Sequence, residues 1–259
     1  MPVQRRSGIP ILMYHSIDPV RSILSVSPPL FQQQMDWLHR QKFTVISLSE
    51  LVKTLKDNTP QPECSAVLTF DDAYESLYQH VFPVLKRYGF PASIFIVAGR
   101  SGGHNDWPGQ PAGIPHLPVL GWNQIREMDA AGIEFGAHTI HHPRLDRLPD
   151  DQARIEILGS KRIIEEQLGH SIGSFAYPYG RFNTTIKIIV QSAFSCACGT
   201  RVGLVNSHSD PFALERIDIQ YLRHPIVFQA LSNGLLPYYL HIRRMMRTIR
   251  SMLFKRTWV

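Results

Sequence analysis

The chain carries the stretch Ala66-Val67-Leu68-Thr69-Phe70-Asp71-Asp72-Ala73, an apolar run that ends in two adjacent carboxylates. We predict a buried strand that ends at this pair, followed by a helix over residues 73–88. In alternating β/α proteins, functional side chains gather at the carboxyl ends of the strands. A divalent cation would separate the roles of two such carboxylates, because it binds one and leaves the other free as a base. The alternative is that Asp72 caps the helix and Asp71 is solvated.

Strand and helix patterns alternate on both sides of this stretch. Strands are predicted over residues 9–15, 43–46, 92–97, 133–137, 174–176, 194–197 and 214–221, and helices over residues 28–39, 49–55, 122–131, 149–168 and 184–192. Such alternation indicates an α/β fold with a parallel sheet, which closes most economically into a barrel. We therefore predict a single-domain (β/α) barrel over residues 9–224, distorted or incomplete with seven strands. A basic amphipathic C-terminal helical tail follows over residues 225–259.

One long irregular segment, over residues 99–121, interrupts the alternation and contains His104, Asp106, Trp107 and His116. Irregular segments of this length inside a compact domain are usually functional or disordered. Trp107 either stacks on a sugar ring or packs on its own loop.

Positive charge is concentrated at the C-terminus. Of 259 residues, 44% are hydrophobic and 19% charged, which is typical of a folded protein with a sizeable core. Residues 241–259 hold six of the 27 lysines and arginines and no acidic residue, so the remaining 21 balance the 21 acidic residues. A neutral body argues against a nucleic-acid partner. The tail resembles an interfacial helix on an anionic membrane, or it packs on the barrel with its arginines solvated.

The cysteines and the N-terminus bear on the compartment. An odd number of cysteines, Cys64, Cys196 and Cys198, argues for a reducing compartment, and the last two are expected to be a buried pair rather than a metal site. Residues 1–10 contain two arginines without the apolar run of a signal peptide, and no stretch reaches the length of a membrane span. We predict a cytoplasmic protein, peripheral at the inner face of the membrane, and leave open a start upstream of Met1.

Two histidines follow the strand predicted over residues 133–137. If the segment turns helically, His138 and His142 share one side and can bind a single ion, whereas His141 is incidental. Neutral imidazole suits zinc, and two histidines with one carboxylate and an open position are typical of a hydrolytic metal site. The alternative is a pair of buried structural histidines.

Three ordered motifs at successive strand ends carry a resemblance. They are Thr69-Phe70-Asp71-Asp72, His138-Thr139-Ile140-His141-His142-Pro143 and Tyr177-Pro178-Tyr179-Gly180. Together they resemble the polysaccharide deacetylase family, which is carbohydrate esterase family 4, also called the nodulation-type chitooligosaccharide deacetylase domain. Met13-Tyr14-His15 resembles the branch that acts on exopolysaccharides such as poly-N-acetylglucosamine. The likeness extends over residues 9–221.

The resemblance implies a role for each matched residue. Asp72, His138 and His142 would hold a divalent metal, usually zinc in this family. Asp71 would be the general base that takes a proton from the attacking water, and the backbone N–H of Tyr179 would stabilise the tetrahedral oxyanion. The implied activity is metal-dependent removal of N-acetyl groups from N-acetylhexosamine units. The substrate would be an acetylated polysaccharide, oligosaccharide or lipid-linked glycan precursor.

The chain departs from the family pattern in its first and third motifs. Ala73 stands where the family usually has glycine, and we expect a helix start to tolerate it. Ala176 stands where the family has the arginine that orients the base. Arg216, near the start of the last predicted strand, is the candidate for the missing cation.

The late Leu-x-His motif, which supplies the family's usual general acid, has no clear match. His15, His208 and His224 are candidates, and His15 is favoured because it ends a strand; alternatively, it only forms a structural hydrogen bond. These departures leave two other functions open. One is hydrolysis of a non-sugar amide or an O-acetyl ester, and the other is a catalytically silent glycan-binding scaffold.

Overall fold

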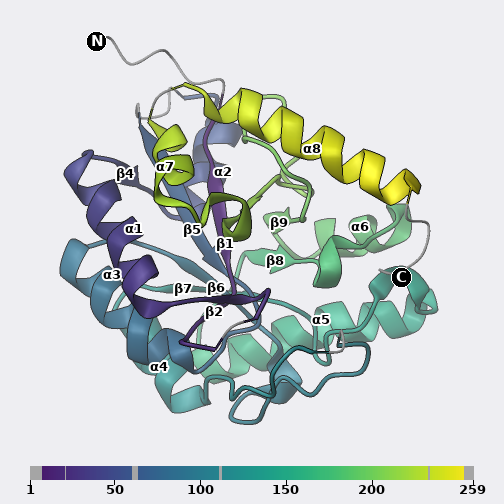
Figure 1. Ribbon diagram of the computed structural model, residues 1–259. Coiled ribbons are helices and arrows are strands. Elements are labelled where there is room, and N and C mark those ends of the chain that lie inside the picture. The colour runs from purple at the N-terminus through teal and green to yellow at the C-terminus, as the bar shows by residue number, and fades with distance from the viewer. Residues whose placement is uncertain (1–7, 21, 60–63, 111–112, 233, 254–259) are drawn as a thin grey trace.

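The computed structural model of the chain is a curled parallel sheet with helices on its outer side (Figure 1). It describes residues 8–20, 22–59, 64–110, 113–232 and 234–253, with the backbone alone for residue 244 and residues 247–253. The main sheet consists of β1 (Ile11–Tyr14), β4 (Thr44–Val45), β5 (Ser65–Phe70), β6 (Ser93–Ile96), β7 (Glu134–Ala137), β8 (Ser174–Ala176), β9 (Cys196–Cys198) and β10 (Ile217–Asp218). The α-helices are α1 (Pro28–Arg40), α2 (Leu48–Asp57), α3 (Phe82–Tyr88), α4 (Trp122–Ala130), α5 (Asp150–Leu168), α6 (Thr184–Gln191), α7 (Pro225–Phe228) and α8 (Leu236–Leu253).

The strand order confirms the predicted incomplete barrel. Seven strands follow one another as β10-β1-β5-β6-β7-β8-β9, and β4 pairs with the first residues of β5. All these neighbours are parallel, so the carboxyl ends of the strands meet at one edge. A single isolated bridge, between Cys198 and Leu214, joins β9 to the segment that precedes β10.

The central strand β5 explains why its sequence is continuously apolar. All six of its residues are buried, because one side faces the barrel interior and the other faces the helices. The interior is filled by a compact group of apolar side chains that includes Ile11, Val67, Phe95 and Cys198. Both members of the predicted cysteine pair, Cys196 and Cys198, are free and buried. Burial raises the pKa of the Cys198 thiol to about 12, which keeps it a neutral thiol at neutral pH.

Two predicted elements differ from the structure. The helix expected from Ala73 begins only at Leu77, with a π-helical turn over Leu77–Val81 that leads into α3. Asp72 and Ala73 have φ values of 70° and 51°, a left-handed conformation that no helix start can use. Glycine adopts this conformation more readily than alanine, and position 73 is not a helix start, so the expectation that a helix start tolerates Ala73 was wrong. The strand expected over residues 214–221 is only two residues long and continues as a 3₁₀ helix over Ile219–Leu222.

The patterns also missed a small pair of strands after β1. β2 (Ser16–Ile17) and β3 (Ser25–Val26) pair in parallel with each other. Each is two residues long, which is too short for a period-two pattern to register.

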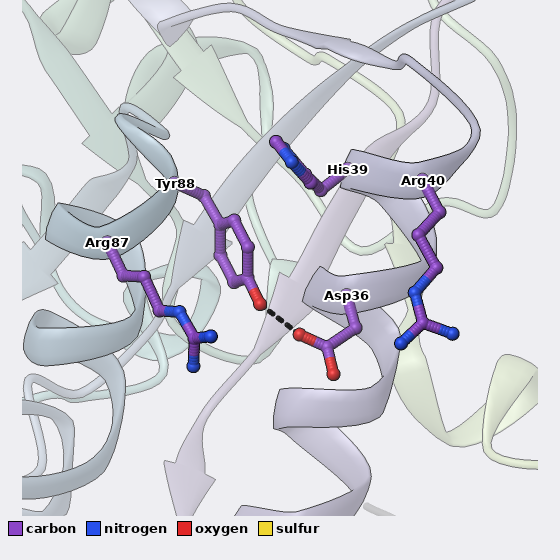
Figure 2. Close-up of a pocket in the computed structure, with 5 residues that line it drawn as sticks. All are labelled: Asp36, His39, Arg40, Arg87 and Tyr88. Carbon is purple, nitrogen blue, oxygen red and sulfur yellow. Dashed lines mark hydrogen bonds between the residues drawn. The ribbon is translucent and has the colours of Figure 1, made fainter.

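Helices α1 and α3 are joined by a polar cluster on the outer surface. Tyr88 on α3 donates a hydrogen bond to Asp36 on α1, with Arg40 and Arg87 on either side (Figure 2). The ring of His39 lies 4.9 Å from that of Tyr88. None of the predicted site residues lines the shallow pocket between these side chains.

The C-terminal segment forms the helix α8, which crosses one side of the molecule (Figure 1). Leu236 and Leu240 are buried, and the Tyr239 hydroxyl donates to the Tyr221 carbonyl at 2.6 Å. Among the described helices, none combines the length and apolar character needed to cross a membrane. Phe254, Lys255 and Arg256 of the predicted tail lie outside the described residues, and the boundary predicted at residue 225 stays a prediction.

Candidate active site

The two carboxylates after β5 point to different partners because the backbone turns sharply between them. Asp71 and Asp72 are both almost fully buried, at 3% and 4% exposure. The left-handed conformation of Asp72 and Ala73 reverses the chain before the next helix. Asp71 therefore contacts Arg216 and Asp72 faces the histidines after β7. This turn is what allows two adjacent acids to have different environments.

Asp72, His138 and His142 bring three ligand atoms to one point. The Nε2 atoms of His138 and His142 lie 3.2 Å apart. Oδ1 of Asp72 lies 3.5 Å from the first and 3.4 Å from the second. In a tetrahedral zinc site with bonds of about 2.0–2.2 Å, neighbouring ligand atoms are about 3.3–3.6 Å apart. The triangle therefore has the dimensions that a small divalent cation requires.

The hydrogen bonding of this triad also fits a cation. Oδ1 of Asp72 is buried without a hydrogen-bond partner among the described residues, which is costly for a carboxylate. Nδ1 of His138 lies 2.7 Å from the Ala176 carbonyl, so it carries the proton and leaves Nε2 as a lone-pair donor. Burial raises the pKa of Asp72 and, together with His138, lowers the pKa of His142. Within the described chain, this is the one cluster of three such side chains that could hold a metal ion.

The segment between the two histidines does not form the helical turn that would have placed them on one side. Thr139 and His142 have positive φ values, and the Thr139 hydroxyl accepts the His142 N–H at 2.9 Å. The two rings still meet, because this compact loop folds His142 back over His138 with ring centroids 4.7 Å apart. His141 points away from the triad, with its side chain about half exposed, as predicted.

Glu156 on α5 holds this loop, a contact that sequence patterns did not predict. One carboxylate oxygen accepts the backbone N–H groups of Ile140 and His141, both at 2.9 Å, and the other lies 2.7 Å from His141 Nδ1. On the opposite side, the Gly99 N–H donates to the Ile140 carbonyl at 2.9 Å. A Cβ at Gly99 would come within 2.7 Å of that oxygen, so the approach requires glycine. The loop is thus fixed from two directions.

Arg216 supplies a cation beside Asp71, which Ala176 cannot do. Its guanidinium donates to both oxygens of Asp71, at 2.6 and 2.7 Å, and its Nε donates to the Gly199 carbonyl. The Arg216 side chain is fully buried, with the guanidinium 5.7 Å from the ring centre of Phe95. Burial alone would raise the pKa of Asp71, but the charge and hydrogen bonds of Arg216 hold it well below its usual range.

Of the three histidines considered for the general acid, the structure brings only His15 to the site. Its Nε2 lies 4.0 Å from Oδ2 of Asp71, and the side chain is 18% exposed. His208 lies in an exposed turn, where its N–H donates to Asn206. The His224 side chain caps α7 instead.

Tyr179 and Trp107 enclose His142. Tyr179 has φ 59° and ψ 6° between Pro178 and Gly180, and its ring lies 4.6 Å from that of His142. Burial, with a smaller contribution from the charge of Asp72, raises the pKa of the Tyr179 hydroxyl to about 12. Trp107 is 3% exposed, and its ring lies 4.8 Å from that of His142. Trp107 is therefore a wall of the site and not an exposed platform for a sugar.

The other polar residues of the long loop are engaged away from the triad. The rings of His104 and His116 stack at 4.2 Å, and Asp106 pairs with Arg100 at 3.1 Å. A separate cavity of about 1110 Å³ is lined by Glu134, Ser174 and Cys196, at the starts of β7, β8 and β9. Because the predicted residues follow the ends of strands, this cavity lies at the other end of the barrel.

The fold and the site define an α/β barrel with a candidate metal centre beside an arginine-paired acid, and comparison with known proteins identifies the family. Residues 58–194 match the polysaccharide deacetylase family. The chain is 32% identical, over 83% of its length and 73% of the relative, to YxkH of Bacillus subtilis (strain 168), whose name assigns it to the polysaccharide deacetylases. It is 26% identical, over 74% of its length and 67% of the relative, to a poly-β-1,6-N-acetyl-D-glucosamine N-deacetylase of Staphylococcus aureus (strain MRSA252).

Solved structures agree with this assignment. IcaB from Ammonifex degensii superimposes with a TM-score of 0.75 and 26% identity, over 89% of this chain and 97% of that one. The Streptococcus pyogenes deacetylase PplD gives a TM-score of 0.73 and 28% identity, over 83% and 93% of the two chains. The chain belongs to the polysaccharide deacetylase family and is a hydrolase of that class.

Proposed function

We propose that this protein is a metal-dependent N-deacetylase of a glycan that contains N-acetylhexosamine. The observation that carries the proposal is the triangle of Asp72, His138 and His142, placed next to the ion pair of Asp71 and Arg216. Its ligand set, of two imidazoles and one carboxylate, suits zinc. When bound, the cation would polarise the acetamide carbonyl and acidify the attacking water.

Asp71 would act as the general base and Arg216 as its positioning residue. Because Arg216 holds its pKa below the usual range, Asp71 stays ionised at neutral pH and can accept a proton from the attacking water. The bidentate contact with Arg216 fixes both carboxylate oxygens and their direction. A base oriented in this way loses little entropy when it takes the proton from the attacking water.

Two further residues would complete the hydrolysis. The backbone N–H of Tyr179 would donate to the tetrahedral oxyanion, a contribution of about 3–4 kcal/mol in comparable acyl-transfer sites. His15 would donate the proton that the leaving amine needs when the C–N bond breaks, giving acetate and a free amino sugar. Its position beside Asp71 supports this role, since the acid and the base must both reach the reacting amide.

The substrate proposal follows the relatives. The Staphylococcus aureus relative is named for poly-β-1,6-N-acetyl-D-glucosamine, and we propose an N-acetylglucosamine polymer, oligomer or lipid-linked precursor here as well. A nucleic-acid partner is not expected, because residues 1–240 hold 21 basic and 21 acidic residues. We also keep the proposal of a cytoplasmic location, which membrane and soluble fractionation of cells would test.

Acetate release tests the proposed reaction. Acetylated glucosamine oligomers should yield acetate with the purified chain, lose the yield after chelation and regain it when zinc is added back. Simple acetyl esters and non-sugar amides, assayed in parallel, distinguish the other hydrolase functions. If no substrate releases acetate and Asp71→Asn leaves glycan binding unchanged, the chain is a silent glycan-binding scaffold and the proposal is wrong.

A further inference from the structure

Exposed apolar side chains are concentrated in one part of the chain, on α7, α8 and the residue before α8. Ten large apolar side chains are exposed among the residues whose side chains the structure describes, and six of them lie between positions 226 and 246. They are Ile226, Leu235, Tyr238, Ile242, Met245 and Met246, with exposures of 52–72%. We call this group the α7–α8 surface. Single exposed apolar residues are ordinary, but a concentration of this kind marks an interaction site.

Helix α8 has two apolar faces, and only one of them packs on the barrel. Leu236 and Leu240, four residues apart, are buried against the body. Tyr238, Ile242 and Met245 repeat at the three- and four-residue spacing of a helix face, and they are exposed. A terminal helix held by one face has no structural need for the second. The exposed stripe is therefore available to another partner.

The positive charge of residues 219–259 indicates which kind of partner the α7–α8 surface would bind. Asp218 is the last acidic residue, and residues 219–259 contain seven arginines and lysines. Residues 1–218 then hold 20 basic and 21 acidic residues. A second copy of the chain would bring the same positive segment against itself, and like charges oppose such contact. An anionic surface with an apolar interior complements both the charge and the stripe.

We propose that the α7–α8 surface docks on the anionic face of a membrane, with α8 parallel to the plane and its exposed stripe inserted shallowly. In this arrangement α8 lies along the membrane surface and does not cross it. Each basic residue near an anionic bilayer strengthens binding, and burial of the apolar stripe adds to it. The inference goes beyond the proposed reaction, because it concerns where the enzyme works and would hold for any substrate.

Vesicle flotation with the full chain tests this docking. The unaltered protein should bind vesicles of phosphatidylcholine with about one-third phosphatidylglycerol, bind pure phosphatidylcholine at least about tenfold less, and dissociate as salt is raised. The triple variant Tyr238→Ser/Ile242→Ser/Met245→Ser should bind the anionic vesicles at least about tenfold more weakly than the unaltered protein. Equal binding of both vesicle types, or none by the unaltered chain, would overturn the proposal.

A matched control separates this surface from exposed apolar residues in general. Ile155 on α5 and Ile188 on α6 are 64% and 57% exposed, and Ile155→Ser/Ile188→Ser should leave vesicle binding unchanged. Acetate release from a soluble oligomer should persist in both variants, which distinguishes a failure of docking from a failure of the reaction. Sedimentation velocity tests the alternative that the surface binds a second copy of the chain. If the unaltered protein is a dimer that does not bind vesicles, and the triple variant is a monomer, the surface is a dimer interface and the membrane proposal is wrong.

Discussion

The two neighbouring carboxylates of the site, Asp71 and Asp72, have opposite electrostatic environments. Asp71 is neutralised by a protein cation, with both oxygens bound by Arg216, and its pKa is lowered. Asp72 is equally buried, but its Oδ1 has no partner among the described residues, and its pKa is raised. One acid is satisfied by the chain itself, whereas the other is arranged for a cation that the chain does not supply. In the proposed mechanism, Asp71 would therefore be the oriented base and Asp72 the metal ligand.

Replacing Asp72, the acid that faces the proposed cation site, should have the largest effect on activity. Asp72→Asn keeps the shape of the side chain but removes the charged ligand, so zinc content and acetate release should both fall to background. Metal analysis of the purified variant, with acetate assays on the same sample, measures this. Full zinc occupancy in Asp72→Asn would show that the triad is not the metal site.

Removing the arginine-paired acid should affect catalysis alone. Asp71→Asn should lower acetate release about 10²–10⁴-fold, the usual contribution of a general base, with zinc content unchanged. The contrast with Asp72→Asn is the sharpest test of the division of roles. A variant of Asp71 that loses zinc as well would contradict it.

Arg216→Met should mainly destabilise the fold. It leaves Asp71 as an unpaired buried charge, and breaking a buried pair in this way costs about 3–5 kcal/mol in the free energy of unfolding. Urea denaturation at pH 7 measures the loss. In folded protein the pKa of Asp71 should rise, so the acidic limb of the activity profile should move to higher pH. An unchanged limb would mean that Arg216 does not set the charge state of Asp71.

A smaller effect is expected at the residue that holds the histidine loop. Glu156→Gln keeps the length of the side chain but weakens its contacts with two backbone N–H groups. Direct hydrogen-bond partners of metal ligands typically contribute 10–100-fold to affinity. Glu156 acts only through the backbone of the loop that carries the ligands, so we expect zinc affinity to fall by about tenfold or less. Glu166→Gln, on the exposed side of the same helix, is the matched control and should leave the affinity unchanged.

The smallest effect is a pH-dependent stabilisation by zinc. Asp71, with a lowered pKa, stabilises the fold above the ordinary carboxyl pKa of about 4 and loses this contribution as the pH falls. Asp72, with a raised pKa, costs stability as the pH rises through its folded pKa without a cation. Zinc at one fixed concentration, about 100-fold above its Kd at pH 7.5, should therefore raise Tm by about 5–10 °C at pH 7.5 and by less at pH 5.5, where protonation of the ligands weakens binding. An equal rise at both pH values would contradict this linkage.

The α/β barrel could be predicted because its sequence patterns are local. The candidate metal triad could be predicted because its residues belong to short sequence motifs. Apolar runs of strand length, separated by helical periods, define the parallel sheet, and carboxyl ends of parallel strands must share an edge. Asp72, His138 and His142 follow such ends, and so they meet. The shape of the histidine loop was not predictable, since a four-residue spacing describes a helix and a compact loop equally well.

Sequence alone determined that the Asp71-Asp72 pair and His138 directly follow strands, that Ala176 lacks a cationic side chain, and that positive charge is concentrated at the C-terminus. Only the tertiary structure decided which partners meet. Arg216 reaches Asp71 across 145 positions, Glu156 holds a loop from another element, and α8 turns one apolar face to solvent. The physical reason is that hydrophobic periodicity depends on near neighbours, whereas a bidentate ion pair or an exposed helix face depends on how complete elements pack.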